Sequence, residues 1–151
     1  MSNRFAIAVV LGLAAFTAQA ADSPEPAARP ARPAAADLTQ ARALIAKQDW
    51  NAAIAELKRA VRSAPKNADV HNLLGYSYRN AGQIDKAFSE YEIALGIDPK
   101  HRGAHEYVGV AYLIAKRPDK ANEHLAALKS ICGENCEEYQ DLAKAIADYK
   151  P

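Results

Sequence analysis

The sequence that decides the fold occurs twice. Residues 71–78 read HNLLGYSY, and thirty-four positions later residues 105–112 read HEYVGVAY. The match extends further, because the Asp-Lys-Ala at 85–87 returns at 119–121. Self-similarity at a fixed period of about 20–50 residues indicates structural units stacked one on another. The chain therefore predicts a repeat architecture.

A weaker copy of the same unit precedes these two. Six of its residues fall in register with the second unit: Ala41, Leu44, Ala53, Leu57, Ala60 and Pro65 align with Gly75, Tyr78, Ala87, Tyr91, Ala94 and Pro99. In all three units apolar residues recur every three or four positions, which is typical of amphipathic helices, and no run alternates as a strand would. We predict an all-α protein, with helices at 38–47, 50–63, 68–81, 84–96, 102–115, 118–131 and about 137–149.

At these residues the chain resembles the tetratricopeptide repeat family, whose pattern is Trp, Leu-Gly, Tyr, Ala, Phe and Pro over a repeat of about 34 residues. The second unit matches it best, with Leu74-Gly75, Tyr78, Ala87, Tyr91 and Pro99, and has His71 where the family favours Trp. The third unit has Val108-Gly109, Tyr112, Ala121 and Leu125 but no closing Pro, and the first has Ala41 in place of Gly. The resemblance implies a right-handed solenoid of three helix pairs, at about 37–67, 68–101 and 102–131, capped by the helix at 137–149.

The residue types suit such a stack. Small residues let paired helices approach closely, and they occur at Gly75, Gly109, Ala87 and Ala121. Larger ones fill the space between successive units, and they occur at Tyr78, Tyr91, Tyr112 and Leu125. Gly82 and Pro118 predict the turns within the second and third units, and Pro99 predicts a helix end.

The first 36 residues predict export rather than a folded element. Residues 1–20 combine an early Arg, an apolar run and a closing Ala-Gln-Ala, which indicates a signal peptide cleaved before Ala21. Residues 21–36 read ADSPEPAARPARPAAA, a composition that cannot bury a core and predicts a disordered linker. We expect a periplasmic or secreted protein whose domain spans 37–151, with no membrane span after cleavage.

Charge excludes one class of partner. The net charge is +1, with 19 Lys and Arg against 18 Asp and Glu intermixed along the chain. Nucleic-acid binding draws on clustered positive charge, so a nucleic-acid partner is not expected. A partner that is itself a protein or peptide fits this surface better.

The two cysteines lie close together, in the run CGENC at 132–136 between the last repeat helix and the capping helix. Gly and Asn favour a tight turn, and export permits oxidation, so we predict a disulfide between Cys132 and Cys136. A metal site needs three or four ligands, with only Glu134, Glu137 and Glu138 nearby. A catalytic dithiol is also open, although the redox motif with two intervening residues is absent.

The histidines and the remaining motifs do not indicate catalysis. His101 and His105 have the i, i+4 spacing of metal-binding helices, but Pro99 places His101 before the helix is established. His71 and His105 occupy equivalent repeat positions, which indicates packing between helices. The sequence has no nucleophile elbow and no phosphate-binding Gly loop. We therefore expect neither an enzyme nor a cofactor.

The resemblance also implies where a partner would bind. In this family the first helix of each pair lines an inner face that receives a peptide or a helix. Its predicted contact residues are, unit by unit, Leu38, Arg42 and Ile45, then Asn72, Tyr76 and Arg79, then Glu106, Val110 and Leu113. Tyr76 and Arg79 form the predicted hot spot, because Tyr and Arg contribute binding energy disproportionately. The alternative, that these predicted contact residues are ordinary solvated helix residues, stays open.

The predicted function is a protein–protein interaction scaffold or adaptor in the cell envelope. Three repeats make a short groove, so self-association into a homodimer is the alternative within the binding class. From another class, the alternative is a thiol redox or metal-handling protein that uses Cys132 and Cys136.

Overall fold

The computed structural model describes residues 37–150, and the predicted signal peptide and linker lie outside them. Within this part every regular element is a helix, so the predicted all-α fold is confirmed. The helices are α1 (Thr39–Ala46), α2 (Trp50–Ser63), α3 (Ala68–Asn80), α4 (Ile84–Ile97), α5 (Arg102–Ile114), α6 (Pro118–Cys132) and α7 (Glu137–Asp148). Each predicted helix end agrees with these bounds to within one residue. None of the helices between 37 and 150 is long and apolar enough to cross a membrane.

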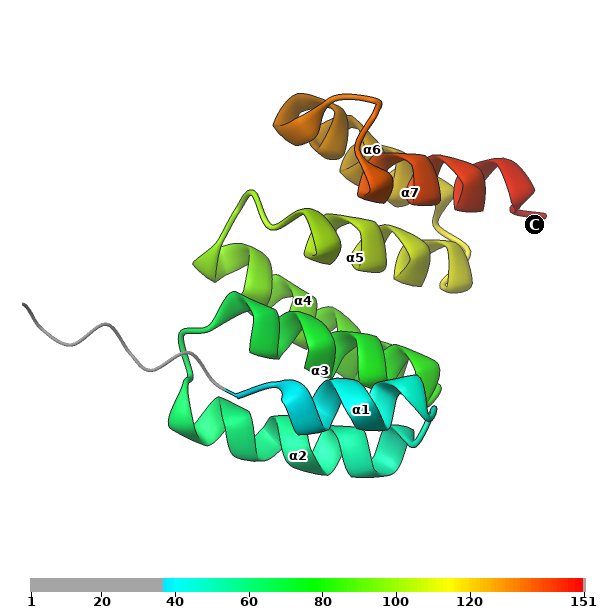
Figure 1. Ribbon diagram of the computed structural model, residues 1–151. Helices are drawn as coiled ribbons and strands as arrows, with labels where there is room; N and C mark the ends of the chain where they lie inside the picture. Colours follow the sequence, from blue (N-terminus) through cyan, green and yellow to red (C-terminus); the bar gives the residue numbers. More distant parts are fainter. Residues whose placement is uncertain (1–36, 151) are drawn as a thin grey trace, which may run out of the picture. The chain divides into compact units, whose positions relative to one another are not determined.

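The helices pack as three pairs and a cap. Each helix contacts the next one along the chain, α3 contacts α5, and α7 packs on both α5 and α6. Figure 1 shows α1, α3, α5 and α7 as one row, with α4 and α6 behind it. The first helices of the pairs and the cap therefore share one side of the domain, which we call the first-helix face.

Two glycines allow the closest approaches between helices. A Cβ atom added to Gly75 would lie 2.6 Å from Cε1 of Tyr91, and one added to Gly109 would lie 2.6 Å from Cδ2 of Leu142. Tyr91 and Leu142 are fully buried, and burying one such side chain contributes about 1.5–3 kcal/mol. At these two predicted small positions, the side chain of Tyr91 or Leu142 therefore occupies the space that a larger residue would need.

The turns within the repeats share one backbone conformation. Gln48, Gly82 and Lys116, each thirty-four positions apart, have φ values of 57°, 74° and 58°. The predicted turn at Gly82 is confirmed, and the other two repeats reach the same left-handed conformation with a residue that adopts it at a cost. Pro118 then occupies the first position of α6, where its missing N–H costs nothing.

A histidine braces each of the last two repeats. In the second repeat, Nδ1 of His71 lies 2.7 Å from Oε2 of Glu90, and Nε2 lies 3.1 Å from the carbonyl oxygen of Pro65. In the third repeat, Nδ1 of His105 lies 2.9 Å from Nδ1 of His124. Its Nε2 lies 3.1 Å from the carbonyl oxygen of Pro99, which is equivalent to Pro65. The predicted packing role of both histidines is confirmed.

His101 occupies a different place. It is the N-cap of α5, and its Nδ1 accepts a hydrogen bond of 3.1 Å from the backbone N–H of Ala104. Its Nε2 lies 3.1 Å from Oδ1 of Asp69 on α3. His101 therefore precedes the helix, as predicted, and links the second and third repeats.

Candidate functional site

Three aromatic rings form a row that crosses all three repeats. The ring of Trp50, the first residue of α2, meets that of Tyr76 on α3 edge-on, with centroids 6.1 Å apart. The ring of Tyr76 in turn lies 4.8 Å from that of Tyr107 on α5. Aromatic pairs at these separations attract beyond the area that they bury. We call Trp50, Tyr76 and Tyr107, with Arg79, the aromatic row.

Arg79 belongs to this row because it follows Tyr76 by three residues and so shares its helix face. The guanidinium carbon lies 5.1 Å from the ring centroid of Tyr76 and 5.6 Å from that of Tyr107. Such cation–π contacts contribute about 0.5–2 kcal/mol each. Its Nε is buried and has no hydrogen-bond partner among residues 37–150. The tyrosines therefore hold Arg79 in place through ring contacts, and no hydrogen bond at its Nε from the described residues contributes.

Glu106 adds a carboxyl group beside the row. Burial, together with the negative charge of Asp141 on α7, raises the pKa of Glu106 to about 7. The Arg79 guanidinium opposes this shift. Burial and the nearby Glu106 also raise the pKa of the Tyr107 hydroxyl. Glu106 is thus a half-buried group whose charge changes near neutral pH.

A groove of about 680 Å³ adjoins the row at Tyr107. Asn72 forms part of its wall, is only 5% exposed, and has a buried Oδ1 without a hydrogen-bond partner among the described residues. The other lining residues come from α1, from α3, from the α4–α5 loop and α5, and from the α6–α7 junction: Arg42, Ala68, Asp69, Leu73, Asp98, Lys100, His101, Arg102, Gly103, Ile131, Cys132 and Glu138.

The charges of the groove are partly paired. Asp69 pairs with His101, and Glu138 lies 3.4 Å from Nε of Arg102. Arg42 and Lys100 also line the groove, and neither forms an ion pair with another residue in the range 37–150. Asp98 likewise lines the groove without an ion pair in this range, and its Oδ1 accepts a hydrogen bond of 2.9 Å from the backbone N–H of Lys100. The groove therefore offers two cations, one carboxylate and one buried amide oxygen.

The structure brings most of the predicted contact residues together. Tyr76 and Arg79 lie in the aromatic row, Glu106 lies beside it, and Arg42 and Asn72 line the groove. Ile45 and Val110 are half-buried. Leu38 and Leu113 are only 9% and 6% exposed, so they belong to the packed interior and not to an accessible face.

Trp50 and Tyr107 were absent from the predicted contact set. Trp50 begins the second helix of its pair, so a rule that selects first helices does not reach it. The sequence does mark Trp50 as a candidate contact residue, because it is the only Trp in the chain and Trp is enriched at binding sites. Tyr107 lies next to the predicted Glu106 on α5, and its contact with Tyr76 depends on how α3 and α5 are rotated, which the repeat spacing does not define.

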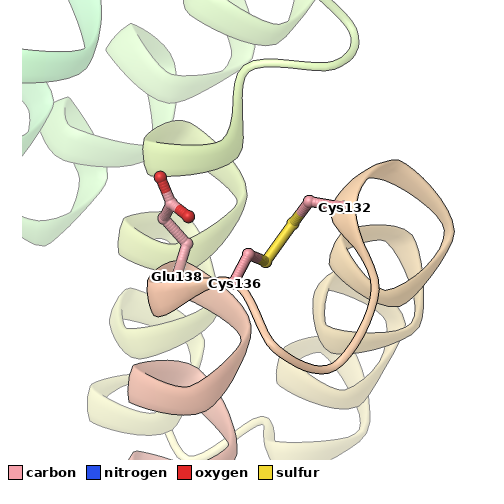
Figure 2. A group of neighbouring side chains, drawn as sticks. All are labelled: Cys132, Cys136 and Glu138. Atoms are coloured by element: carbon pink, nitrogen blue, oxygen red, sulfur yellow. A yellow bond between two sulfur atoms is a disulfide. The ribbon is translucent and has the colours of Figure 1, made fainter.

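The α6–α7 junction carries the predicted disulfide (Figure 2). Cys132 ends α6, Cys136 precedes α7, and the two sulfur atoms are bonded. Figure 2 also shows Glu138, from the first turn of α7, beside this pair. The bond joins the cap to the last repeat helix, at a wall of the groove that Cys132 and Glu138 line.

Helix pairs repeated at one spacing and closed by a capping helix define the class of helical-repeat proteins. A sequence model of the tetratricopeptide repeat matches residues 38–102 and, in an overlapping match, residues 74–135. The chain therefore belongs to the tetratricopeptide repeat family. None of the curated protein sequences matches it.

Solved tetratricopeptide repeat domains share this fold. The TPR domain of Arabidopsis OM64 aligns with a TM-score of 0.66 at 17% identity, covering 74% of this chain and 92% of that one. The TPR2B domain of yeast Sti1, solved as a pHsp70 complex, aligns with a TM-score of 0.66 at 18% identity over 74% and 94% of the two chains. The Sgt2 TPR domain from Aspergillus fumigatus has a TM-score of 0.66 at 22% identity, over 72% and 73%. Identities this low show a common fold alone.

Proposed function

We propose that this chain is a binding module that holds an extended segment of another protein along its first-helix face, and that it acts by binding and not by catalysis. The observation that carries the proposal is the aromatic row, in which three repeats contribute rings and Arg79 stacks on two of them. Trp, Tyr and Arg are the residues that most often dominate binding energy. Here they are held in place before a partner arrives, which lowers the entropic cost of binding.

The groove supports an extended peptide as the partner. A buried amide oxygen without a hydrogen bond costs about 1–3 kcal/mol. Rotation of the Asn72 side chain toward the groove would let a backbone N–H of a bound peptide satisfy its Oδ1. Extended peptides present such groups along their length. Arg42 and Lys100 would pair with acidic groups of the same segment. The yeast Sti1 domain, whose structure is a complex with pHsp70, gives a precedent for a protein partner on this fold.

We also propose that the protein works in the periplasm or outside the cell. The signal-peptide pattern of residues 1–20 supports this location, as does a disulfide, since disulfides persist in oxidising compartments. Intact-mass analysis of the protein from a cell-envelope fraction tests it. A mass that corresponds to a chain beginning at Ala21 is expected, and a chain that retains Met1 or Ser2 would contradict export.

Site-specific photo-crosslinking tests the binding face. A photo-reactive residue replaces Lys100, which is exposed and lines the groove, in cells that make the protein. The matched control places it at Ile93, which is 44% exposed on α4, a second helix of its pair. We expect the Lys100 position to trap a specific protein and the Ile93 position to trap none.

The same experiment separates the alternatives. Crosslinking at Ile93 but not at Lys100 would contradict the first-helix face as the interaction surface. A product of twice the mass of the chain, formed at Lys100, would identify the homodimer as the assembly and leave the groove without a foreign partner.

A further inference from the structure

Cys132, Cys136 and Glu138 bring together a set of metal-ligand atoms that the binding function does not use. The two sulfur atoms and a carboxylate oxygen of Glu138 all lie within 4.8 Å of one another, and the three residues are half-buried (Figure 2). While the sulfurs are bonded to each other, they do not act as thiolate ligands. We propose that reduction of this disulfide converts the α6–α7 junction into a three-donor site for a thiophilic divalent cation such as Zn²⁺.

The chemistry balances with a dithiol as the reductant. The S–S bond of Cys132 and Cys136 takes up two electrons and two protons from the dithiol, which itself becomes a disulfide. The cation then displaces the two thiol protons to solvent, and both thiolates bind it. Oxidation and metal binding therefore exclude each other at this site.

The backbone already has the spacing that a metal site needs. With Zn–S bonds of about 2.3 Å, two thiolates in a tetrahedral site lie about 3.8 Å apart. The Cα atoms of Cys132 and Cys136 are 5.9 Å apart. Rotation of the two side chains can therefore separate the sulfurs to that distance while α6 and α7 stay in place.

The position of Cys136 leaves its sulfur available as a ligand. It is the N-cap residue of α7, and its side chain makes no capping hydrogen bond. Once the disulfide is opened, its sulfur therefore breaks no helix cap when it turns toward a metal ion.

The charges around the junction are mixed. Oε1 of Glu138 lies 3.4 Å from Nε of Arg102, which orients the carboxylate and adds one positive charge beside the site. Lys129 on α6 is paired with Glu134 at 2.5 Å, and Glu137 adds a further negative charge. Since Cys132 and Glu138 line the groove, the fourth position of a tetrahedral ion is reached from the groove, where water or a donor from a partner would complete it.

The test is Co²⁺ binding, with Zn²⁺ displacement, by the full chain. The protein is reduced with a phosphine, which does not compete for the metal as a thiol does, and is compared with the oxidised protein. Reduced protein should bind one Co²⁺ with the near-ultraviolet absorption of thiolate-to-cobalt charge transfer, and Zn²⁺ should abolish that absorption. Oxidised protein should show neither change, and Cys132→Ser should lose the absorption.

Two matched variants test the third donor. Glu138→Gln should weaken Zn²⁺ binding to the reduced protein by about tenfold or more, which is the scale of losses around metal sites. Glu134→Gln, a neighbouring acid outside the donor set, should change it by less than about twofold. The proposal fails if the oxidised protein binds as tightly as the reduced one, if reduced protein shows no thiolate absorption, or if the two Glu variants weaken binding equally. None of these outcomes depends on whether a protein partner exists.

Discussion

The second and third repeats place different residues at the same positions. The space beside Gly75 is occupied by Tyr91 of the same helix pair, whereas the space beside Gly109 is occupied by Leu142 of the capping helix. The bracing histidine meets Glu90 in the second repeat and His124 in the third. The repeat therefore defines where contacts form, while the residue at each position decides how that contact responds to substitution and to pH.

A first contrast is expected for Gly75→Ala against Gly109→Ala. The new Cβ at position 75 meets the rigid ring of the fully buried Tyr91, and overpacking of this kind costs about 1–3 kcal/mol. At position 109 it meets the methyl ends of Leu142, which can move, and the gain in helix propensity of about 1 kcal/mol offsets the cost. The same propensity gain applies at position 75, so urea unfolding should show Gly75→Ala destabilised by about 1 kcal/mol net and Gly109→Ala nearly unchanged. Equal losses would contradict the comparison.

The histidine braces should respond differently to acid. Burial and the neighbouring His105 lower the pKa of His124 to about 4 from its ordinary 6.5; Glu123 raises it and Lys120 lowers it. Because the folded pKa lies below the unfolded one, the unfolded state binds more protons between these values. The contribution of the neutral His124 ring to the free energy of unfolding is then fully present above about pH 6.5, and it is lost as the pH falls through 4.

The variant His124→Glu gives the third repeat the pairing of the second. Between pH 7 and 4 we expect this variant to lose less stability than the wild type by about 1–2 kcal/mol, after allowance for solvent screening. Both ring nitrogens of a histidine that faces a carboxylate and a carbonyl are satisfied when the ring is protonated. Unfolding free energies at four pH values measure the difference, with Glu90→Gln as the control in the second repeat. Parallel pH curves for His124→Glu and wild type would contradict this account.

A third pair of equivalent positions is Asn72 and Glu106. The folded pKa of Glu106, about 7, lies above its ordinary 4.5, so its contribution to stability is present below pH 4.5 and is lost as the pH rises through 7. Glu106→Gln should therefore match the wild type at pH 4.5 and exceed its stability by about 1 kcal/mol at pH 8. This trend opposes that of His124, so the two variants must be compared separately. If the difference in stability between Glu106→Gln and the wild type is the same at pH 8 as at pH 4.5, the Glu106 carboxyl is solvent-exposed and this account is wrong.

The smallest effect concerns the left-handed turns. Gly82→Ala forces a side chain into the conformation that Gln48 and Lys116 already adopt, and it should destabilise the protein by up to about 1 kcal/mol. Lys116→Gly should be neutral or slightly stabilising, because it removes the same strain. Thermal unfolding of both variants measures the pair. A loss for Lys116→Gly as large as that for Gly82→Ala would show that turn strain does not differ between the repeats.

The sequence defined the helices closely because two signals coincide in it. The thirty-four-residue register and the three-to-four spacing of apolar residues both restrict where each helix begins and ends. The conformation at Gln48 and Lys116 could have been predicted by the same register from Gly82. The aromatic row was only half predicted, because the contacts of Trp50 and Tyr107 with Tyr76 depend on helix rotation between units. Likewise, the distance between Glu138 and the two sulfurs follows from the fold of the α6–α7 junction and not from spacing.

The most direct test of the binding proposal is the affinity of the partner trapped at Lys100. Its dissociation constant is measured for the wild type, for Tyr76→Ala/Arg79→Ala and for the control Ile93→Ala/Ile97→Ala, which changes two exposed residues of α4. Helical circular dichroism is checked in each variant. We expect about 100-fold weaker binding for the first variant, which corresponds to about 2.7 kcal/mol, and wild-type affinity for the control. If the Tyr76→Ala/Arg79→Ala protein binds within about threefold of the wild type, the aromatic row is not the binding site.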